Sequence, residues 1–322
     1  FPYTTLFRSP ATSFWKKLSS LWRVWGITSQ LEKEGIELFH GLSNELPLNI
    51  HKSRIKSIVT IHDLIFLRYP QYYQSIDRKI YTYKFRKACE NADKIIAISE
   101  CTKRDIIRYF NIPDDKIEVV YQGCDVSFTH PVTEEKKEEV RKKYQLPDHY
   151  ILNVGSIEER KNILAAVQAL PMLPQHIHIV IVGRRTGYTE KVEQFIKDNG
   201  LGERVHIISN VPFNDLPAFY QSAEIFVYPS RFEGFGIPII EALYSGTPVV
   251  AATGSCLEEA GGPDSIYVNP DDITGLADAF KQIYSNSDKR KNMVEKGREF
   301  AKRFSEKQQS EEIINIYKKL IR

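Results

Sequence analysis

The second half of the chain alternates short apolar runs with segments that have helical spacing. A run that is apolar at nearly every position is typical of a strand buried on both faces, as in a parallel sheet covered by helices. About six such runs follow one another, and this pattern predicts a complete doubly wound α/β domain. The runs are YILNVGS (150–156), IHIVIVG (177–183), RVHIIS (204–209), EIFVYPS (224–230), PVVAA (248–252) and SIYVN (265–269).

The first part of the chain shows the same alternation with fewer strands. Only about four runs precede Asp125. Ser99 follows one of them and is a good N-cap for a helix over 100–110. The pattern predicts a second doubly wound domain that is incomplete. The runs are IELFHG (36–41), SIVTIHD (57–63), DKIIAIS (93–99) and KIEVVYQG (116–123).

These patterns predict an α/β protein with two Rossmann-like domains, over 1–126 and 127–305. A charged stretch over 133–149 predicts a solvated helix and a turn, and 306–322 predicts an amphipathic helix that returns to the first domain. Ligands of doubly wound domains bind outside the carboxyl ends of the strands, so we expect a cleft between the two domains. The apolar side of the last helix is made by Ile313, Ile314, Tyr317 and Leu320.

Composition narrows the class of protein. Forty-four basic and 41 acidic residues leave a net charge of +3, which is too balanced for a dedicated nucleic-acid binder. Four cysteines without a CxxC motif favour a reducing compartment, so we expect a cytoplasmic protein. No apolar run approaches the roughly 20 residues that span a bilayer.

All three tryptophans lie near the start of the chain, beside basic residues. This segment is either a packed surface helix or an amphipathic segment that touches a membrane at its interface. The residues that suit an interface are Trp15, Lys16, Lys17, Trp22, Arg23 and Trp25.

The stretch NVGSIEERKN (153–162) joins a strand to a helix. The strand ends at Gly155, and Arg160 and Lys161 come directly before the helix, which Asn162 is predicted to cap. Two cations and free backbone N–H groups at one helix start suit a phosphate group. An ordinary surface Arg–Lys pair is the alternative.

A second stretch, YPSRFEGFGIPIIEAL (228–243), carries two glutamates eight positions apart. Pro238 favours a helix start and Gly246 a helix end, so Glu233 falls in a loop and Glu241 about one turn into the helix. A carboxylate that stabilises the first helical turn is the alternative for Glu241.

The loop between the two glutamates is built for close approach to a ligand. Gly234 and Gly236 carry no side chain that would keep a ligand from the backbone. We expect the amides of Phe235, Gly236 and Ile237 to face the cleft.

These residues resemble a known family. SRFEGFGIPIIEALYSGTPVVA closely resembles the E-x7-E signature of retaining glycosyltransferases of family 4, and VGSIEERKN resembles their phosphate-binding segment. YQGCD (121–125) is similar to their inter-domain hinge, with Gln122 where Asn is usual. LFHGLSNELP and VTIHDLIF resemble the N-terminal domain of the mannosyltransferase-like branch. The resemblance implies a GT-B fold, with the first domain incomplete because no opening strand and glycine-rich loop precede residue 36.

The resemblance also implies a role for each site residue, with no metal ion. Arg160 and Lys161 would neutralise a diphosphate leaving group, and Glu241 would accept hydrogen bonds from ribose hydroxyls. Glu233 and His62 would lie by the sugar ring, although His62 has the alternative of a hydrogen bond to Asp63 or to a backbone carbonyl. The remaining implied donor-binding residues are Gly155, Val211, Gly234, Phe235, Gly236 and Ile237.

Together these inferences predict a retaining, metal-independent hexosyltransferase without a cofactor. Its substrates would be a GDP- or UDP-linked sugar, with GDP-mannose preferred, and a glycan or lipid-linked acceptor in cell-surface polysaccharide assembly. It would be cytoplasmic, with a peripheral contact at the inner face of the membrane. The alternatives are a nucleotide-sugar-binding fragment without activity and a nucleotide-sugar epimerase on the same fold.

Overall fold

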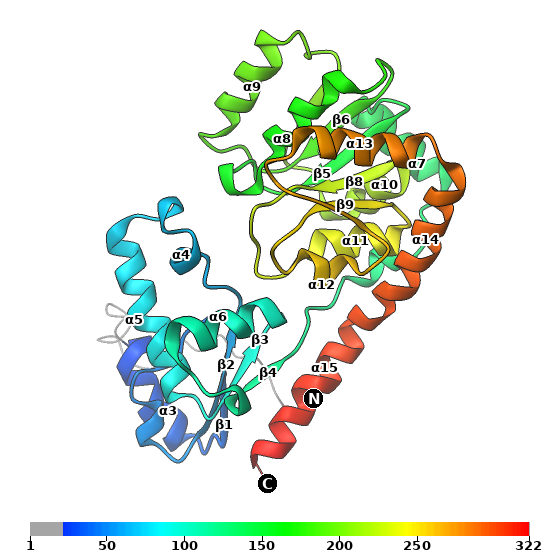
Figure 1. Cartoon of the computed structure of the whole chain (residues 1–322). Coiled ribbons are helices and arrows are strands. Elements are labelled where there is room, and N and C mark those ends of the chain that lie inside the picture. Colours follow the sequence, from blue (N-terminus) through cyan, green and yellow to red (C-terminus); the bar gives the residue numbers. More distant parts are fainter. Residues whose placement is uncertain (1–21, 322) are drawn as a thin grey trace. The chain divides into compact units, whose positions relative to one another are not determined.

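The computed structural model describes residues 22–321 of the chain. They divide into two compact units: unit 1 holds residues up to Val120 together with those from Glu312 onward, and unit 2 holds Tyr121–Glu311. Each unit has its own parallel sheet (Figure 1). The domain boundaries predicted at residues 126 and 305 lie within six residues of these limits. That the two units are separate folding domains stays a prediction.

The sheet of unit 1 has the strand order β1-β2-β3-β4 in the described chain, with every pair parallel. Its central strand β2 is buried at every position after Lys56, which explains the continuous apolar run in the sequence. All four strands coincide with predicted runs. They are β1 (Leu38–Gly41), β2 (Lys56–Ile61), β3 (Lys94–Ala97) and β4 (Ile117–Val119).

Helices of unit 1 connect these strands. Ser99 Oγ accepts a hydrogen bond from the amide of Thr102, which confirms the predicted N-cap of α6. The helices are α3 (Ile27–Lys33), α4 (Ile65–Arg68), α5 (Ser75–Asn91) and α6 (Glu100–Phe110), with the short helical turns η1 (Trp22–Gly26), η2 (Ile50–Lys52), η3 (Pro70–Tyr72) and η4 (Asp114–Lys116).

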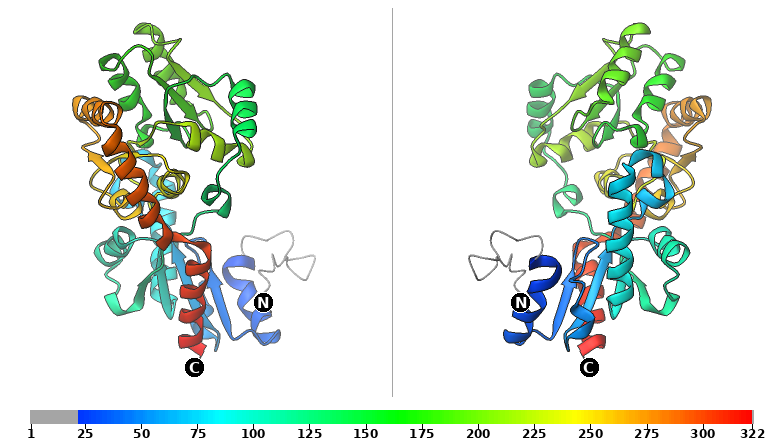
Figure 2. Two further views of the ribbon diagram at one scale, coloured as in Figure 1. Left: turned by 90° about the vertical axis from the view of Figure 1, so that its right-hand side faces the viewer. Right: turned by 90° about the vertical axis from the view of Figure 1, so that its left-hand side faces the viewer.

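The last helix of the chain, α15 (Glu306–Ile321), packs its final turns on the sheet of unit 1 (Figure 2). Ile316 is buried with Ile58, Ile96 and Val120, which belong to that sheet or directly follow it. The predicted apolar side was wrong at Ile314. Residues 313, 316, 317 and 320 repeat at the helical period, and 314 lies beside that row.

The sheet of unit 2 has the order β10-β9-β8-β5-β6-β7 in the part of the chain that the structure describes, again all parallel. All six strands coincide with predicted runs. They are β5 (Tyr150–Val154), β6 (His178–Val182), β7 (Val205–Ile208), β8 (Ile225–Tyr228), β9 (Val249–Ala252) and β10 (Ile266–Val268).

Helices cover both faces of this sheet (Figure 1). One face packs a large apolar cluster with α8, α9 and α13, and the other faces α10, α11 and α12. The helices are α7 (Glu134–Tyr144), α8 (Ile163–Ala169), α9 (Thr189–Asp198), α10 (Leu216–Ser222), α11 (Ile237–Ser245), α12 (Leu257–Gly261), α13 (Ile273–Tyr284) and α14 (Ser287–Ala301), with the turns η5 (Val126–Thr129), η6 (Glu159–Lys161), η7 (Leu170–Met172), η8 (Phe213–Asp215) and η9 (Lys302–Phe304).

The strand order reverses at β5. The chain continues from β5 to β6 on one side, and β8 later adds on the other side. In open parallel sheets, this switch point leaves a crevice at the carboxyl ends of the two central strands. The loops that follow β5 and β8 therefore lie side by side.

The aromatic segment near the start of the chain is only partly described. Trp15, Lys16 and Lys17 lie outside the described residues. Trp22 is buried, in agreement with the packed alternative, whereas Trp25 is 52% exposed. No helix in residues 22–321 is long and apolar enough to cross a bilayer.

His40 connects α15 to the sheet of unit 1. Its Nδ1 lies 2.6 Å from the Tyr317 hydroxyl, and its Nε2 lies 2.7 Å from Thr60 Oγ1. Burial lowers the pKa of His40 from 6.5 to about 4. Between these two values, the unfolded chain binds a proton that the folded chain does not.

We therefore expect stability to fall as the pH falls from about 6.5 to about 4, by at most about 1.4 kcal/mol per pH unit. This contribution is fully present above pH 6.5. His40→Gln does not titrate, so its difference from the wild type in free energy of unfolding should shrink as the pH is lowered through this window. Denaturant unfolding at several pH values measures this difference, and a constant difference would contradict the prediction.

Candidate functional site

A partly buried ion pair joins the loops that follow β5 and β8. Arg160 Nη1 lies 2.8 Å from Glu233 Oε2, and Lys161 Nζ lies 3.9 Å from Glu233 Oε1. The three side chains are only 13–19% exposed. A backbone hydrogen bond from the amide of Arg231 to the carbonyl of Arg160 also ties the two loops. The structure thus brings together the two predicted cations and the first of the two glutamates.

Neutral donors complete the surroundings of Glu233. The Tyr228 hydroxyl donates to Oε1 at 3.1 Å, and Ser230 Oγ donates to the same oxygen at 2.8 Å. Arg160 also donates to the carbonyl of Phe232. Burial alone would lower the pKa of Arg160, but the charge and hydrogen bond of Glu233 outweigh burial and raise it. Arg160 is therefore charged at neutral pH.

Gly155 makes room for Lys161. A Cβ at Gly155 would lie 3.0 Å from Lys161 Nζ, which is tighter than ordinary contact. The backbone of Gly155 has φ of 152°, outside the range that other residues favour. The glycine after β5 is thus needed both for the backbone turn and for the position of the lysine ammonium.

Asn162 is the N-cap residue of α8 as predicted, but its side chain donates elsewhere and makes no cap hydrogen bond. It adopts the left-handed conformation with φ of 55°, and its Nδ2 donates to the carbonyls of Pro229 at 3.2 Å and Pro270 at 2.8 Å. Asn162 therefore joins the loops after β5, β8 and β10 at the carboxyl edge of the sheet.

The loop between the two glutamates presents unused backbone donors. Within the described chain, no hydrogen bond is recorded for the amides of Phe235, Gly236 and Ile237. They precede or begin α11, where the helix dipole favours negative charge. The Cys256 thiol lies 3.0 Å from the Glu233 carbonyl and 2.7 Å from the Phe235 carbonyl, which fixes the loop from behind.

Glu241 lies apart from the ion pair, one turn into α11 as predicted. Gly246 ends this helix in the left-handed conformation, also as predicted. The fully buried Tyr220 hydroxyl donates to Glu241 Oε2 at 2.7 Å. Burial raises the pKa of Glu241 above its ordinary value, and the hydrogen bond from Tyr220 partly offsets this rise.

Val211 lies in the loop after β7, and β7 is two strands away from β5 in the sheet. Neighbouring strands are about 4.8 Å apart, so this loop is about 10 Å from the loop after β5. Val211 is therefore on the same edge of the sheet as the ion pair but not in contact with it.

His62 belongs to unit 1, directly after β2. Its Nε2 donates to the carbonyl of Leu42 at 2.8 Å, and its backbone amide donates to Asn44 Oδ1 at 2.7 Å. The sequence analysis gave a hydrogen bond from His62 to a backbone carbonyl as the alternative to a sugar contact, and the structure contains this bond. It fixes the ring and leaves Nδ1 as the nitrogen that could act on a ligand.

Sequence reasoning missed four residues that hold the site together. Tyr228 is one of them, because its hydroxyl donates to Glu233. A polar residue at the end of a central parallel strand is a general signal for this role, because strand ends line the ligand edge. The other residues that were missed are Ser230, Tyr220 and Cys256.

The arrangement is suited to an anion that carries more than one negative charge. Two cations and three unpaired amides lie on one edge of one sheet, and each is a strong donor to phosphate oxygens. Among residues 22–321, no group of three or more His, Cys, Asp or Glu side chains lies close enough to hold a metal ion.

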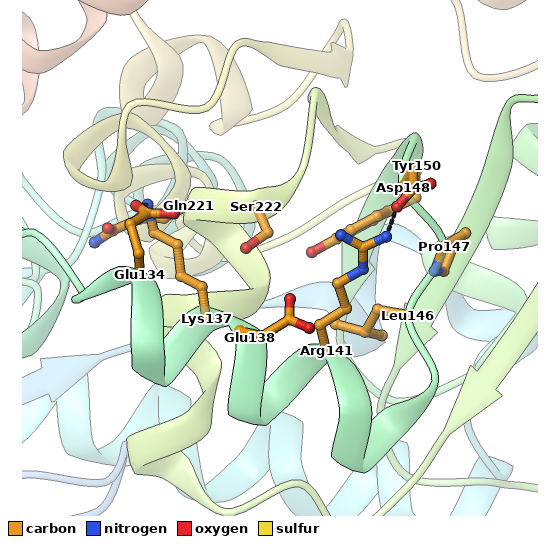
Figure 3. A pocket seen from close by; sticks show the side chains of 10 residues that line it. All are labelled: Glu134, Lys137, Glu138, Arg141, Leu146, Pro147, Asp148, Tyr150, Gln221 and Ser222. Atoms are coloured by element: carbon orange, nitrogen blue, oxygen red, sulfur yellow. Dashed lines mark hydrogen bonds and ion pairs between the residues drawn. The ribbon is translucent and has the colours of Figure 1, made fainter.

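A separate hollow of about 280 Å³ lies beside α7 and the start of β5 (Figure 3). Arg141 pairs there with Asp148, and the Tyr150 hydroxyl donates to the Phe219 carbonyl at 2.7 Å. The hollow adjoins the amino end of β5, opposite the edge that carries Arg160. Its polar groups are largely paired with each other, so it is not the candidate site.

Comparison with protein families gives two matches that together cover most of the chain. Residues 134–300 match the model of "Glycosyl transferases group 1", and residues 3–128 match that of "Glycosyltransferase Family 4".

Among curated proteins, the chain is 31% identical to O-antigen chain mannosyltransferase B of Escherichia coli. This match covers 88% of the chain and 74% of the relative. The chain is also 29% identical to O-antigen chain mannosyltransferase RfbU of Salmonella typhimurium, over 70% of the chain and 60% of that protein.

Solved structures share the fold over most of the chain. Sucrose-phosphate synthase from Thermosynechococcus elongatus superposes with a TM-score of 0.79 at 23% identity, over 98% of the chain and 81% of the synthase. HepE of Anabaena in complex with UDP has a TM-score of 0.79 at 17% identity, over 96% of the chain and 85% of HepE.

Two Rossmann-like α/β units with parallel sheets, the second of which carries a cationic loop at its switch point, define a protein of the GT-B class. The chain belongs to the glycosyl transferases group 1 family, within the family 4, mannosyltransferase-like branch, and is a glycosyltransferase.

The role of Asn162 can be tested by substitution with glycine, which keeps the left-handed backbone and removes both side-chain hydrogen bonds. We expect Asn162→Gly to lower the free energy of unfolding by about 1–3 kcal/mol, because two carbonyls lose their donor. Asn162→Ala should cost about 1–2 kcal/mol more, since alanine disfavours this conformation. Urea unfolding measures both effects.

Asn111 provides the matched control. It is also left-handed, with φ of 56°, and within the described residues its side chain makes no recorded hydrogen bond. Asn111→Gly should change stability by less than about 0.5 kcal/mol. Equal changes in the free energy of unfolding at the two positions would show that the side-chain hydrogen bonds of Asn162 do not stabilise the loops.

Proposed function

We propose that this glycosyltransferase moves mannose from GDP-mannose to a glycan or lipid-linked acceptor in O-antigen-type polysaccharide assembly, with retention at the anomeric carbon. The names of its relatives support the sugar and the pathway, since several are O-antigen or serotype-specific mannosyltransferases. The single observation that carries the proposal is the pairing of Arg160 and Lys161 with Glu233 at the switch point of the second sheet.

In this proposal, Arg160 and Lys161 hold the diphosphate of the donor. Cleavage of the glycosidic bond leaves negative charge on the phosphate oxygen, and two fixed cations stabilise that charge as it develops. One well-placed donor of this kind commonly contributes about 3–4 kcal/mol to the transition state. The amides of residues 235–237 would add hydrogen bonds to the phosphate or to sugar hydroxyls.

Two positive side chains supply the charge that a divalent ion supplies in other transferases. This supports the metal-independent reaction that the family resemblance implies. The nucleotide sugar is the substrate, and the proposal includes no further cofactor.

Glu233 is proposed to orient the sugar rather than to attack it. Its carboxylate is held by Arg160, Tyr228 and Ser230, with Lys161 nearby. A carboxylate with this many donors is a weak nucleophile, because its lone pairs are engaged and its charge is balanced. We therefore favour a front-face reaction, in which the leaving phosphate helps to take the proton of the acceptor hydroxyl.

Arg160 can serve both Glu233 and a phosphate. A guanidinium has five N–H donors. In the structure, Arg160 Nη1 faces Glu233, and Nη2 lies 3.7 Å from Glu158 Oε2. The longer contact is the one that a phosphate oxygen would replace at least cost.

Glu241 is proposed to accept hydrogen bonds from the ribose hydroxyls. Tyr220 occupies Oε2, so Oε1 is the oxygen available to the nucleotide. Tyr220 is then a positioning residue, because it fixes the carboxylate without touching the ligand. His62 stays a proposed sugar contact, through Nδ1.

Lys161→Ala tests the assignment of the phosphate site. Lys161 Nζ lies as far as 3.9 Å from Glu233 Oε1, so loss of the lysine should affect folding little. Turnover should fall by about 10²–10³-fold. Initial rates with GDP-mannose and an acceptor glycan measure the effect, and thermal unfolding checks the fold. Arg184→Ala is the control, because Arg184 follows β6 on the same edge but is 77% exposed. Equal rates for Lys161→Ala and the wild type would reject the assignment.

The nucleotide is identified by the shift in unfolding temperature with GDP, UDP and ADP. A ligand at about 100 times its Kd stabilises the folded state by about 2.7 kcal/mol. We expect GDP to give the largest shift and Lys161→Ala to reduce it. A larger shift with UDP would overturn GDP-mannose as donor and leave the phosphate site intact. Binding without transfer to any acceptor would favour an inactive binding protein.

Tyr220→Phe tests the role of Glu241 through pH. Loss of the hydroxyl removes an interaction that lowers the pKa of Glu241, so this pKa should rise further. Protonated Glu241 accepts ribose hydrogen bonds poorly. As the pH is lowered, GDP binding should therefore begin to weaken at a higher pH in Tyr220→Phe than in the wild type. Calorimetry measures this binding.

Tyr150→Phe is the matched control for Tyr220→Phe. The Tyr150 hydroxyl is as deeply buried but donates to the carbonyl of Phe219. This variant should lose stability without any change in the pH profile of GDP binding. Identical profiles for Tyr220→Phe and the wild type would count against Glu241 as the ribose contact.

A further inference from the structure

The ring of Phe235, from the loop between the two glutamates, is buried in an aromatic cluster of unit 2 and is only 2% exposed. It stacks on the ring of Tyr121, with the centroids 5.3 Å apart and the planes at 22°. It also meets the ring of Phe304 at 5.5 Å in an edge-on arrangement. Tyr121 and Phe304 are themselves 5.5 Å apart, again edge-on. Stacked and edge-on pairs are the favoured aromatic geometries, so each ring is fixed by the other two.

This cluster connects the loop to both ends of unit 2. Tyr121 is the first residue of the unit, and Phe304 lies in η9, close to the end of the unit. The amide of Cys124 donates to the carbonyl of Phe304 at 3.0 Å, and a parallel bridge between Cys124 and Ser305 continues this contact. The two ends of unit 2 therefore meet beside the ring of Phe235.

Gly123 and Arg303 hold these two ends together. A Cβ at Gly123 would lie 2.8 Å from the backbone of Glu306, so only glycine allows this close approach. Arg303 lies over the rings of Tyr121 and Phe304, 5.3 Å from each centroid, which is a cation–π distance. The place of Tyr121 is thus fixed by its neighbours in the backbone as well as by the other rings.

We propose that Tyr121 is a positioning residue for the nucleotide sugar. Phe235 lies between two glycines, so its backbone would have wide conformational freedom if its ring were not packed. Stacking on Tyr121 fixes the loop before a ligand arrives, and a site that is already ordered binds more tightly. The inference rests on the proposed function, in which the amides of residues 235–237 contact the phosphate or the sugar hydroxyls.

Cys256 gives a measure of loop order that needs no ligand. Its thiol is fully buried and lies 2.7 Å from the carbonyl of Phe235 and 3.0 Å from that of Glu233. A loop that loses its packing uncovers this thiol, and a buried thiol is inert towards alkylating reagents until it is uncovered. Cys89 and Cys101 are buried in unit 1 and serve as internal references.

Tyr121→Ala in the full chain tests the inference. We expect Cys256 to be alkylated about tenfold faster than in the wild type, by mass spectrometry under native conditions, with unchanged rates at the internal references. The affinity for GDP-mannose, or for a UDP-sugar if UDP gives the larger thermal shift, should fall by about tenfold in calorimetry without acceptor.

Two further variants at this position keep the test decisive. Tyr121→Phe retains the stacked ring, so the alkylation rate and the affinity should both return to within about twofold of the wild type. Thermal unfolding checks that each variant is folded. Tyr121→Leu keeps much of the apolar volume without a planar ring, and it replaces Tyr121→Ala if alanine prevents folding.

Tyr284→Ala is the matched control in unit 2. Tyr284 is a half-buried residue at the end of α13 that packs against the core of this unit, beside Glu224, which precedes β8. Loss of this ring should lower the stability of the protein and change neither the alkylation of Cys256 nor the affinity for the nucleotide sugar.

The inference is overturned if Tyr121→Ala matches Tyr284→Ala in either measurement. Faster alkylation of Cys256 with unchanged affinity would show that Tyr121 orders the loop but does not position the nucleotide sugar. A wild type that binds neither GDP-mannose nor a UDP-sugar is a different result, because it rejects the proposed function and this inference with it.

Discussion

The ion pair between Arg160 and Glu233 is the interaction on which the second unit's ligand edge depends. The strand order places β5 next to β8, but it does not by itself fix the loops that follow them. The ion pair does so, and because both side chains are mostly buried, neither charge is stable without the other. Tyr228 and Ser230 supply the further hydrogen bonds that a buried carboxylate requires. The same edge then needs a glycine beside Lys161 and a left-handed residue at position 162.

An internal carboxylate beside two cations also has an energetic effect on ligand binding. The cations are already oriented, so a phosphate group does not bear the full entropy of ordering them. In the proposed function, the phosphate would share these cations with Glu233, and this competition would lower the affinity for the phosphate. Glu241 stands outside this competition, because its partner is the neutral hydroxyl of Tyr220.

Much of this organisation is visible in the sequence because parallel strands buried on both faces give uninterrupted apolar runs. All ten strands of the described chain were predicted in this way, as were the position of Glu241 on its helix and the helix end at Gly246. What could not be predicted depends on partners distant in sequence. The side chain of Asn162 is expected to cap α8 until the carbonyls of Pro229 and Pro270 are placed beside it.

The sequence also does not show in which direction a side chain points. The Tyr228 hydroxyl gives no sign in the sequence that it contacts Glu233, and Trp22 gives no sign that it is buried. The predicted apolar row of the last helix included Ile314 and left out Ile316. These two residues point to nearly opposite sides of a helix, so the error was to choose by hydrophobicity and not by the helical period.

The C-terminal helix has a consequence for how the chain can be divided. Unit 1 is assembled from two separate stretches of sequence, since residues from Glu312 onward complete its core around Ile58 and Ile96. Unit 2 is therefore an insertion within unit 1, joined to it at both of its ends. No single cut separates the two units, and the apolar face around Ile58 and Ile96 is covered only after Ile316 has been synthesised.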